Sequence, residues 1–301
     1  MPDGDGVFLV PEMSPDARVR VFRRSLSALE EFEGFEVDAY AIITDRYVVV
    51  LDTMLFPDDV AVMMQSLQEE LRGRQVLCVN SHADWDHVYG NSYFTGMHAA
   101  PIIAHEHCRA RLQSAEARNE LADFQKRYPI FASVALVPPA ITFIQGLTIH
   151  GGNLTIQLLP APGHRLDHVA AWVPELSLLL AFDAVEMPIP SIENAAGAPY
   201  MFATLESLIA LQPHVVLCSH GKTTNPQLMQ DNLSYLREIE QRCHAVIQTQ
   251  RPEAADLAHP SKLINYPFDE VIAGVTAPVD RTFYEQVHED NIRAITEWLM
   301  G

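Results

Sequence analysis

The sequence has few cysteines, no long hydrophobic run and no recognisable leader. Its four cysteines, Cys78, Cys108, Cys218 and Cys243, include no C-x-x-C pair, and this argues for reduced thiols in a cytoplasm rather than for disulfides. No apolar run approaches the roughly 20 residues of a membrane span. The first residues lack the basic start and apolar core of a signal peptide. We therefore predict a cytoplasmic protein with no membrane partner.

Positive charge is also scarce. The chain has 20 Lys and Arg residues against 39 Asp and Glu residues, for a formal net charge of −19. Nucleic-acid phosphates and anionic membranes are bound by basic patches, so this balance argues against both as the main partner and leaves a small-molecule substrate. The sequence also contains no G-x-S-x-G, P-loop or G-x-G-x-x-G motif, so nothing indicates a serine nucleophile or a nucleotide cofactor.

The composition is that of a globular protein. The 301 residues are 48% hydrophobic, which allows a sizeable core in two small domains or in one large layered domain. No internal repeat, low-complexity run or linker is present, so we predict one domain.

Strand and helix patterns alternate along this domain. Apolar and alternating runs predict strands at residues 8–10, 19–22, 37–43, 47–52, 75–79, 100–104, 142–144, 147–149, 154–159, 168–173, 178–182 and 215–217. We assign the strands from residue 142 onward to a second sheet. Amphipathic spacing predicts helices at residues 57–72, 106–126, 200–211, 227–250 and 279–300. The last helix could cover the core or a partner, which leaves a homodimer open.

The most distinctive stretch is Asn80–Asn91, which contains two histidines and two carboxylates within six residues. The stretch follows the predicted strand 75–79 directly, and α/β folds place their chemistry at the carboxyl ends of such strands. The four side chains are ligand types that suit zinc, iron or manganese: His82, Asp84, Asp86 and His87. Asp and His are also ordinary turn and capping residues, so the cluster alone leaves both interpretations open.

Three further hydrophobic runs each end in a single histidine or aspartate. The run from Leu158 ends in Pro-Gly and His164, the run from Leu178 ends in Asp183, and the run from Val215 ends in Cys-Ser and His220. Together with the first cluster, the chain therefore offers seven candidate ligands at the ends of predicted strands. This is a more specific pattern than the cluster alone.

The order H-x-D-x-D-H, Gly-His, strand-end Asp and Ser-His-Gly resembles the metallo-β-lactamase-fold superfamily, from about Phe35 to His220. The resemblance implies an αββα four-layer sandwich of two mixed β-sheets flanked by helices. It would form a single domain over residues 1–301 with a helical extension from about residue 226 to 301. The resemblance also implies two metal pockets bridged by Asp183, with His82, Asp84 and His164 in the first and Asp86, His87 and His220 in the second.

Asp84 departs from the commonest family pattern. Most of the hydrolases that this chain resembles have histidine at this position, whereas flavodiiron oxygen reductases have glutamate. An additional carboxylate makes the first pocket harder and more anionic, and this shifts its preference from zinc toward iron or manganese. We expect two divalent metal ions, with zinc as the first choice and iron or manganese as alternatives.

Other residues near these motifs have expected roles. Asp52-Thr53 resembles a strand-end Asp-Thr of the family that supports the metal loop from behind, with Met54 where glycine is usual. Gly163 is expected to let the backbone approach a metal closely. Lys222 could orient an anionic substrate group or be an ordinary surface lysine.

Three additional histidines are not predicted to be ligands. His105 and His107 form an H-x-H pair at the start of a predicted helix, so we expect capping or surface roles. His168 begins a predicted strand, and we interpret it as a structural residue or as one that supports a metal ligand.

Hydrolysis is the function that this site would serve. Two divalent cations about 3.5–4 Å apart share a bridging hydroxide at neutral pH and polarise the oxygen of the bond under attack. Asp86 could protonate the leaving group and is our predicted catalytic residue. The family resemblance leaves esters, lactones, thioesters and related bonds open as substrates.

Two other functions remain open. The carboxylate of Asp84 suggests a non-haem diiron redox protein that reduces oxygen or nitric oxide, but this sequence contains no flavin domain to supply the electrons. A metal-binding scaffold without turnover is the other alternative.

Overall fold

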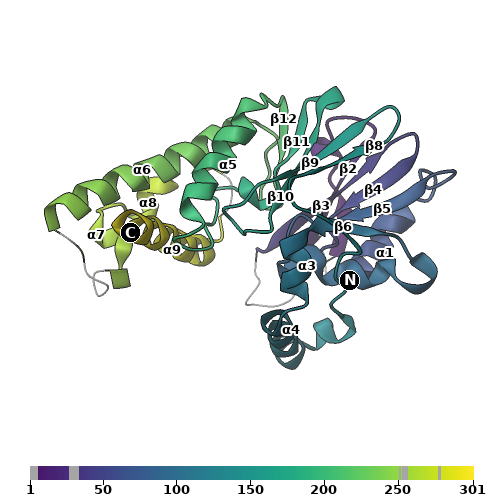
Figure 1. The fold of residues 1–301 in the computed structure, drawn as a ribbon, viewed down its shortest axis with the longest axis horizontal. Helices are drawn as coiled ribbons and strands as arrows, with labels where there is room; N and C mark the ends of the chain where they lie inside the picture. The colour runs from purple at the N-terminus through teal and green to yellow at the C-terminus, as the bar shows by residue number, and fades with distance from the viewer. Residues whose placement is uncertain (1–5, 27–33, 251, 253–256, 277–278) are drawn as a thin grey trace. The chain divides into compact units, whose positions relative to one another are not determined.

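The computed structural model describes residues 6–26, 34–250, 252, 257–276 and 279–301. The chain divides into two compact units, of which the first contains residues 1–160 and 167–180 and the second contains residues 161–166 and 181–301. The element labels are those of Figure 1. The single domain over residues 1–301 stays a prediction, and residues 251, 253–256 and 277–278 of its expected helical extension lie outside the described residues.

Unit 1 contains a seven-stranded sheet whose strands lie in chain order. The three pairs from β1 to β4 are antiparallel, whereas the three pairs from β4 to β7 are parallel. The strands are β1 (Gly6–Leu9), β2 (Val19–Ser25), β3 (Glu36–Ile43), β4 (Tyr47–Leu51), β5 (Gln75–Val79), β6 (Ile102–His105) and β7 (Ile141–Phe143).

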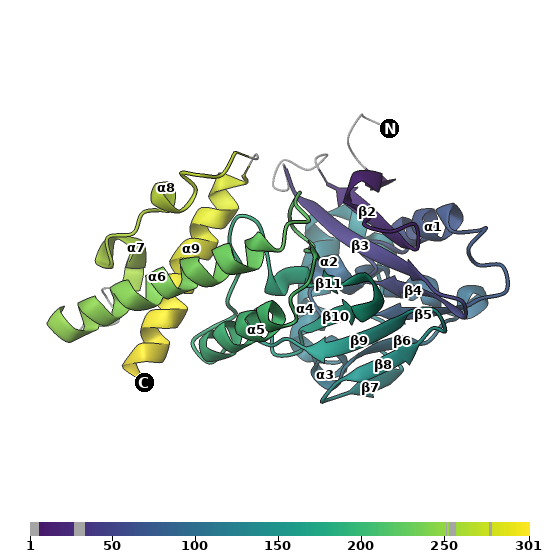
Figure 2. The same ribbon diagram turned by 90° about the horizontal axis from the view of Figure 1, so that it is seen from above.

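The second sheet of unit 1 is antiparallel, in the order β11-β10-β9-β8. Its strands are β8 (Leu147–His150), β9 (Thr155–Pro160), β10 (Val169–Val173) and β11 (Leu178–Leu180). Figure 2 shows both sheets of this unit. We predicted that the strand near residue 142 belongs to the second sheet, and this was wrong. Residues 141–143 pair with β6 in the first sheet, and the turn at Gly146 (φ 132°) separates them from β8.

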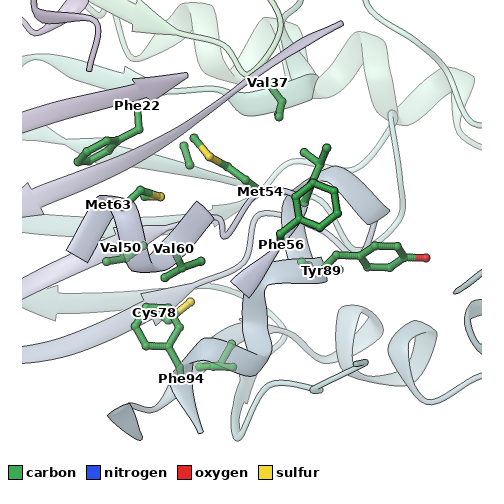
Figure 3. Packing of buried hydrophobic residues seen from close by; sticks show 14 of the residues in the cluster. Phe22, Val37, Val50, Met54, Phe56, Val60, Met63, Cys78, Tyr89 and Phe94 are labelled. Carbon is green, nitrogen blue, oxygen red and sulfur yellow. The ribbon is translucent and has the colours of Figure 1, made fainter. Parts of the chain in front are cut away.

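Helix α1 (Pro57–Ser66) connects the parallel strands β4 and β5. Pro57 at its first position and acidic residues in its first turn favour a helix start there. Figure 3 shows part of the packing on this side of the sheet, where Val50 and Cys78 of the strands and Val60 and Met63 of the helix belong to one buried cluster. The helix ends before the predicted residue 72, because the N–H of Leu67 bonds back to Met64 and tightens the last turn.

The predicted helix at residues 106–126 consists of two helices, α3 (Glu106–Leu112) and α4 (Ala115–Arg127). Between them, the Ser114 side chain accepts a hydrogen bond from the N–H of Ala117 and caps α4. The remaining helical segments of unit 1 are short: η1 (Pro11–Met13), α2 (Trp85–Val88), η3 (Tyr89–Phe94), η4 (Gly96–His98), η5 (Pro129–Ser133) and η6 (Pro174–Leu176).

Both faces of the seven-stranded sheet are buried at its centre. On β3, Ala39 and Ala41 face the cluster that includes α1, while the alternate residues Tyr40 and Ile42 are equally buried on the opposite face. A sheet buried on both faces is typical of layered α/β proteins.

Unit 2 is mostly helical. Its elements are η7 (Phe182–Ala184), α5 (Ala198–Ala210), β12 (Val215–Leu217), α6 (Gln227–Gln250), α7 (Pro260–Leu263), α8 (Phe268–Val271) and α9 (Arg281–Met300). The predicted helix at residues 227–250 has these bounds in the structure. His288 of α9 is buried, bonds the hydroxyl of Tyr235 on α6 at 2.9 Å and bonds the carbonyl of Tyr266 at 2.7 Å. In the part of the chain that the structure describes, no helix is long and apolar enough to cross a membrane.

Candidate metal centre

Four of the seven predicted ligands lie on the loop after β5. His82 and His87 are fully buried, Asp86 is buried, and the Asp84 side chain is 15% exposed. Asp84 directly precedes α2, yet its side chain makes no capping hydrogen bond. Asp84 therefore does not act as a side-chain cap of α2, which was the alternative to a ligand role.

The donor atoms of this loop are spaced as metal ligands are. Nε2 of His82 lies 3.5 Å from a carboxylate oxygen of Asp84, and Nε2 of His87 lies 3.5 Å from one of Asp86. These separations are too long for good hydrogen bonds. Two atoms that each lie 2.0–2.1 Å from one tetrahedral zinc ion are about 3.3–3.4 Å apart. The donor set of unit 1 therefore fits a divalent cation in both chemistry and spacing.

The other ring nitrogens of these histidines have polar neighbours that orient the rings. Nδ1 of His87 lies 2.8 Å from Oδ2 of Asp52, and Nδ1 of His82 lies 2.9 Å from the hydroxyl of Ser81. The backbone N–H and the hydroxyl of Ser81 both donate to Asp52, each at 2.7 Å. Burial raises the pKa of Asp52, while the His87 ring and the Ser81 donors act in the opposite direction. Contacts of this kind point Nε2 toward a metal.

The backbone around Asp52 adopts an uncommon conformation. Asp52 and Met54 have φ values of 66° and 55°, in the left-handed region that non-glycine residues rarely adopt. Met54 stands where we expected the family's glycine, which would tolerate this conformation at least cost. The Met54 side chain is fully buried, so its packing offsets the energetic cost of this backbone conformation.

An arginine that no sequence motif predicted forms an ion pair with Asp84. Arg111 of α3 places Nη2 2.5 Å from Oδ1 of Asp84 and Nη1 2.6 Å from Oδ1 of Asp167. The second oxygen of the buried Asp167 accepts the backbone N–H of Ala83 at 2.9 Å. Arg111 lies 27 residues from Asp84 and 56 from Asp167 in the chain, and no local motif marks this connection.

The other three predicted ligands belong to unit 2. Nε2 of His164 and Nε2 of His220 each lie 3.6 Å from the same oxygen of Asp183. Nδ1 of His164 lies 3.3 Å from the carbonyl of Ser191, which favours the tautomer with a lone pair on Nε2. The same carboxylate oxygen therefore faces two imidazole nitrogens at a spacing typical of ligands to a metal ion.

The structure requires glycine at position 163 for a steric reason that we did not predict. Its φ is 140°, and a Cβ added there would lie 2.5 Å from Cα of Met201 in α5. This close approach of the helix, together with the φ value, requires glycine. That the residue also lets the backbone approach a metal stays a prediction.

Glu186 is a second residue that sequence analysis missed. It is buried in the loop after Asp183, and its carboxylate accepts a hydrogen bond from the Tyr284 hydroxyl of α9 at 2.6 Å. Burial raises the pKa of Glu186 to about 7, and the nearby His220 opposes this shift. The sequence signal that could have identified it is its position as the one acidic residue in the apolar segment Ala184–Pro190.

The residues excluded from the ligand set are placed as expected or remain untested. The His105 side chain caps α3 by accepting the N–H of His107, and His107 is exposed. His168 is buried, with its ring 5.1 Å from that of His82. Lys222 is exposed, and its contact with a substrate stays a prediction.

Comparison with known families identifies the chain. The sequence model of the metallo-beta-lactamase superfamily matches residues 33–220, so the protein belongs to this superfamily. The family resemblance and the α/β sandwich of two sheets with helices are thereby confirmed. A search of the curated proteins found no match.

Solved structures show the same fold at low sequence identity. A metallo-beta-lactamase from Pontibacter korlensis has a TM-score of 0.60 and 17% identity, covering 76% of this chain and 97% of that chain. A metallo-beta-lactamase family protein from Thermus thermophilus has a TM-score of 0.62 and 17% identity, covering 98% and 93%. The FIM-1 enzyme from Pseudomonas aeruginosa, solved in a mono-zinc form, has a TM-score of 0.57 and 14% identity, covering 77% and 96%.

Proposed function

We propose that this protein is a metal-dependent hydrolase that holds two divalent cations and cleaves an ester, lactone, thioester or related bond of a small molecule. Membership of the superfamily supports hydrolase activity and metal binding in general. Buried histidine and aspartate side chains that could hold a metal ion are present in each unit. The assignment of individual ligands and of the bond cleaved belongs to the proposal.

The proposal assigns the donors of both units to one dinuclear centre. Its single strongest support is the spacing of histidine nitrogens and carboxylate oxygens, which is 3.5–3.6 Å in unit 1 and in unit 2 alike. Asp183 would be shared by the two cations, since one of its oxygens lies 3.6 Å from both His164 and His220. His82, Asp84 and His164 would bind the first cation, and Asp86, His87 and His220 would bind the second.

The bound cations would supply hydroxide at neutral pH and polarise the oxygen of the bond under attack. The residues of the chain would hold the ligands in position and donate a proton to the leaving group. Asp52 would hold the His87 ring in the tautomer that leaves Nε2 available. Asp86 is the proposed proton donor to the leaving group. Its side chain is largely buried, at 9% exposed.

Zinc is the proposed metal. The ligand set has four imidazole nitrogens and three carboxylates, and zinc accepts both types in tetrahedral sites. Iron and manganese are the alternatives that the additional carboxylate Asp84 suggested. The ion pair between Asp84 and Arg111 offsets part of that charge, which also weakens the reason for a diiron redox function. We therefore propose hydrolysis rather than oxygen or nitric oxide reduction.

Metal analysis of the purified protein beside an assay of several ester classes tests this function. We expect two zinc ions per chain and turnover of a lactone, thioester, β-lactam, sulfate ester or phosphoester. The matched control is the Asp183→Ala variant, purified identically, which separates the protein's own activity from that of contaminants. Iron with a visible absorption band and no hydrolysis of any class would instead support the redox function.

A further inference from the structure

The ion pair between Arg111 and Asp84 bears on which metal the first pocket selects. Asp84 replaces a histidine in the pattern that this chain resembles, and a carboxylate differs from an imidazole in two ways. It carries a full negative charge, and it offers two donor oxygens instead of one nitrogen. Both differences favour harder cations such as manganese and iron over zinc.

The structure compensates for both differences with one side chain. Arg111 Nη2 lies 2.5 Å from Oδ1 of Asp84, while the other oxygen of Asp84 is the one 3.5 Å from Nε2 of His82. The guanidinium thus engages one oxygen and leaves the other directed toward the histidine. Its positive charge lies against the carboxylate. The Asp84 side chain is 15% exposed and the Arg111 side chain is 36% exposed, so solvent screens the pair only in part.

The orientation of Arg111 is fixed independently of Asp84. Nη1 of the same guanidinium lies 2.6 Å from Oδ1 of the fully buried Asp167, and the other oxygen of Asp167 accepts the N–H of Ala83. The planar fork therefore spans two carboxylates, which a lysine ammonium at the same position could not do with the same geometry. Asp167 ties the arginine to the backbone of the metal loop itself.

We propose that Arg111 is a positioning residue that makes Asp84 a single-oxygen ligand of reduced charge, so that Asp84 can serve in place of a histidine and the first pocket keeps a preference for zinc. This inference rests on the proposed metal-dependent function and adds the device that sets its metal selectivity.

A double-mutant cycle tests this role through metal selectivity rather than activity. Zinc and manganese affinities are measured by chelator competition for the full-length protein, Arg111→Gln, Asp84→His and the double variant. In the Asp84 background, Arg111→Gln should lower the ratio of zinc to manganese affinity by at least about ten-fold, within the range of effects of residues that orient metal ligands. In the Asp84→His background, the same change should leave the ratio within about three-fold.

Two further variants separate the role of Arg111 from the effect of changing any arginine of α3. Arg109→Gln removes an arginine from the same helix, where it bonds the carbonyl of Pro139, and should leave the affinity ratio unchanged. Arg111→Lys keeps the charge without the fork and should shift the ratio in the same direction as Arg111→Gln, but less. If Arg111→Gln does not fold, Arg111→Lys replaces it as the test variant. An unchanged ratio of zinc to manganese affinity in Arg111→Lys would then contradict the proposal.

The outcomes separate this inference from the proposed function. An Arg111→Gln protein with an unchanged ratio overturns the inference, as does an equal shift in both backgrounds, which would indicate a structural role through Asp167. If the unaltered protein still binds two cations and hydrolyses a substrate, the proposed function survives that result. If the unaltered protein binds neither metal, both proposals fail.

Discussion

Oδ2 of Asp52 lies 2.8 Å from Nδ1 of His87, and neither side chain is more than 1% exposed. Asparagine at position 52 would keep the shape but lose the charge that orients the imidazole. We expect Asp52→Asn to weaken zinc binding about 10- to 100-fold, measured by competition with a fluorescent chelator. Asp231→Asn, which changes an exposed acid of α6, is the control. Equal zinc affinities for Asp52→Asn and the unaltered protein would exclude this role of Asp52.

Asp183 is expected to be the least replaceable ligand, because one of its oxygens lies 3.6 Å from both His164 and His220. Asp183→Ala should lose metal and activity together, measured by elemental analysis and initial rates on the same preparation. Glu206→Ala removes an acid whose side chain is 55% exposed and should change neither. An Asp183→Ala protein with full metal content and an unchanged rate would contradict the bridging role.

Gly163 should tolerate no side chain. In Gly163→Ala, the new Cβ would meet Met201 of α5 at 2.5 Å, in a backbone conformation of φ 140° that disfavours alanine. We expect a loss of about 2–4 kcal/mol in the free energy of unfolding from strain and overpacking, measured by urea denaturation. In Gly274→Ala, the added Cβ meets nothing within 4 Å, so its stability should be nearly unchanged. Equal stability of the two variants would show that α5 moves away freely.

The strands, and the candidate metal ligands at their ends, could be proposed from the sequence because their signals are local. The run at residues 75–79 ends beside His82, and each later ligand directly follows its own hydrophobic run. Local alternation does not say which sheet a strand joins, however. The same apolar pattern at residues 141–143 fits either sheet, and the structure pairs it with β6.

The residues that support the ligands were harder to predict because their partners are distant in the chain. Arg111 meets Asp167 across 56 residues, and Tyr284 meets Glu186 across 98. One arginine on an amphipathic helix resembles any solvated surface residue until the fold brings it to a carboxylate. Asp52 was identified only because its Asp-Thr pair resembles a family motif.

The buried carboxylate of Asp59 should make stability depend on pH. Burial raises the pKa of Asp59 to about 6, although Arg24 lies 3.1 Å away and opposes the shift. Because the folded protein binds this proton more tightly than the unfolded chain, the contribution of Asp59 is fully present below about pH 4 and is lost as the pH rises through about 6. A shift of about two pH units corresponds to about 3 kcal/mol.

Asp59→Asn, which cannot titrate, is the variant that isolates this contribution. Its free energy of unfolding relative to the unaltered protein should rise by up to about 3 kcal/mol between pH 4 and pH 7, measured by urea denaturation. Using the difference between two proteins cancels the titration of the histidines and of the other acids. A difference that stays constant over this range would show that Arg24 keeps Asp59 charged throughout.

The dinuclear centre can be tested by crystallography of the zinc-loaded protein, with data collected on both sides of the zinc absorption edge. We expect two anomalous peaks about 3.5–4 Å apart. One peak should be bound by His82, Asp84 and His164, the other by Asp86, His87 and His220, with Asp183 reaching both. A single peak, or two peaks with Asp183 bound to neither, would contradict the dinuclear centre.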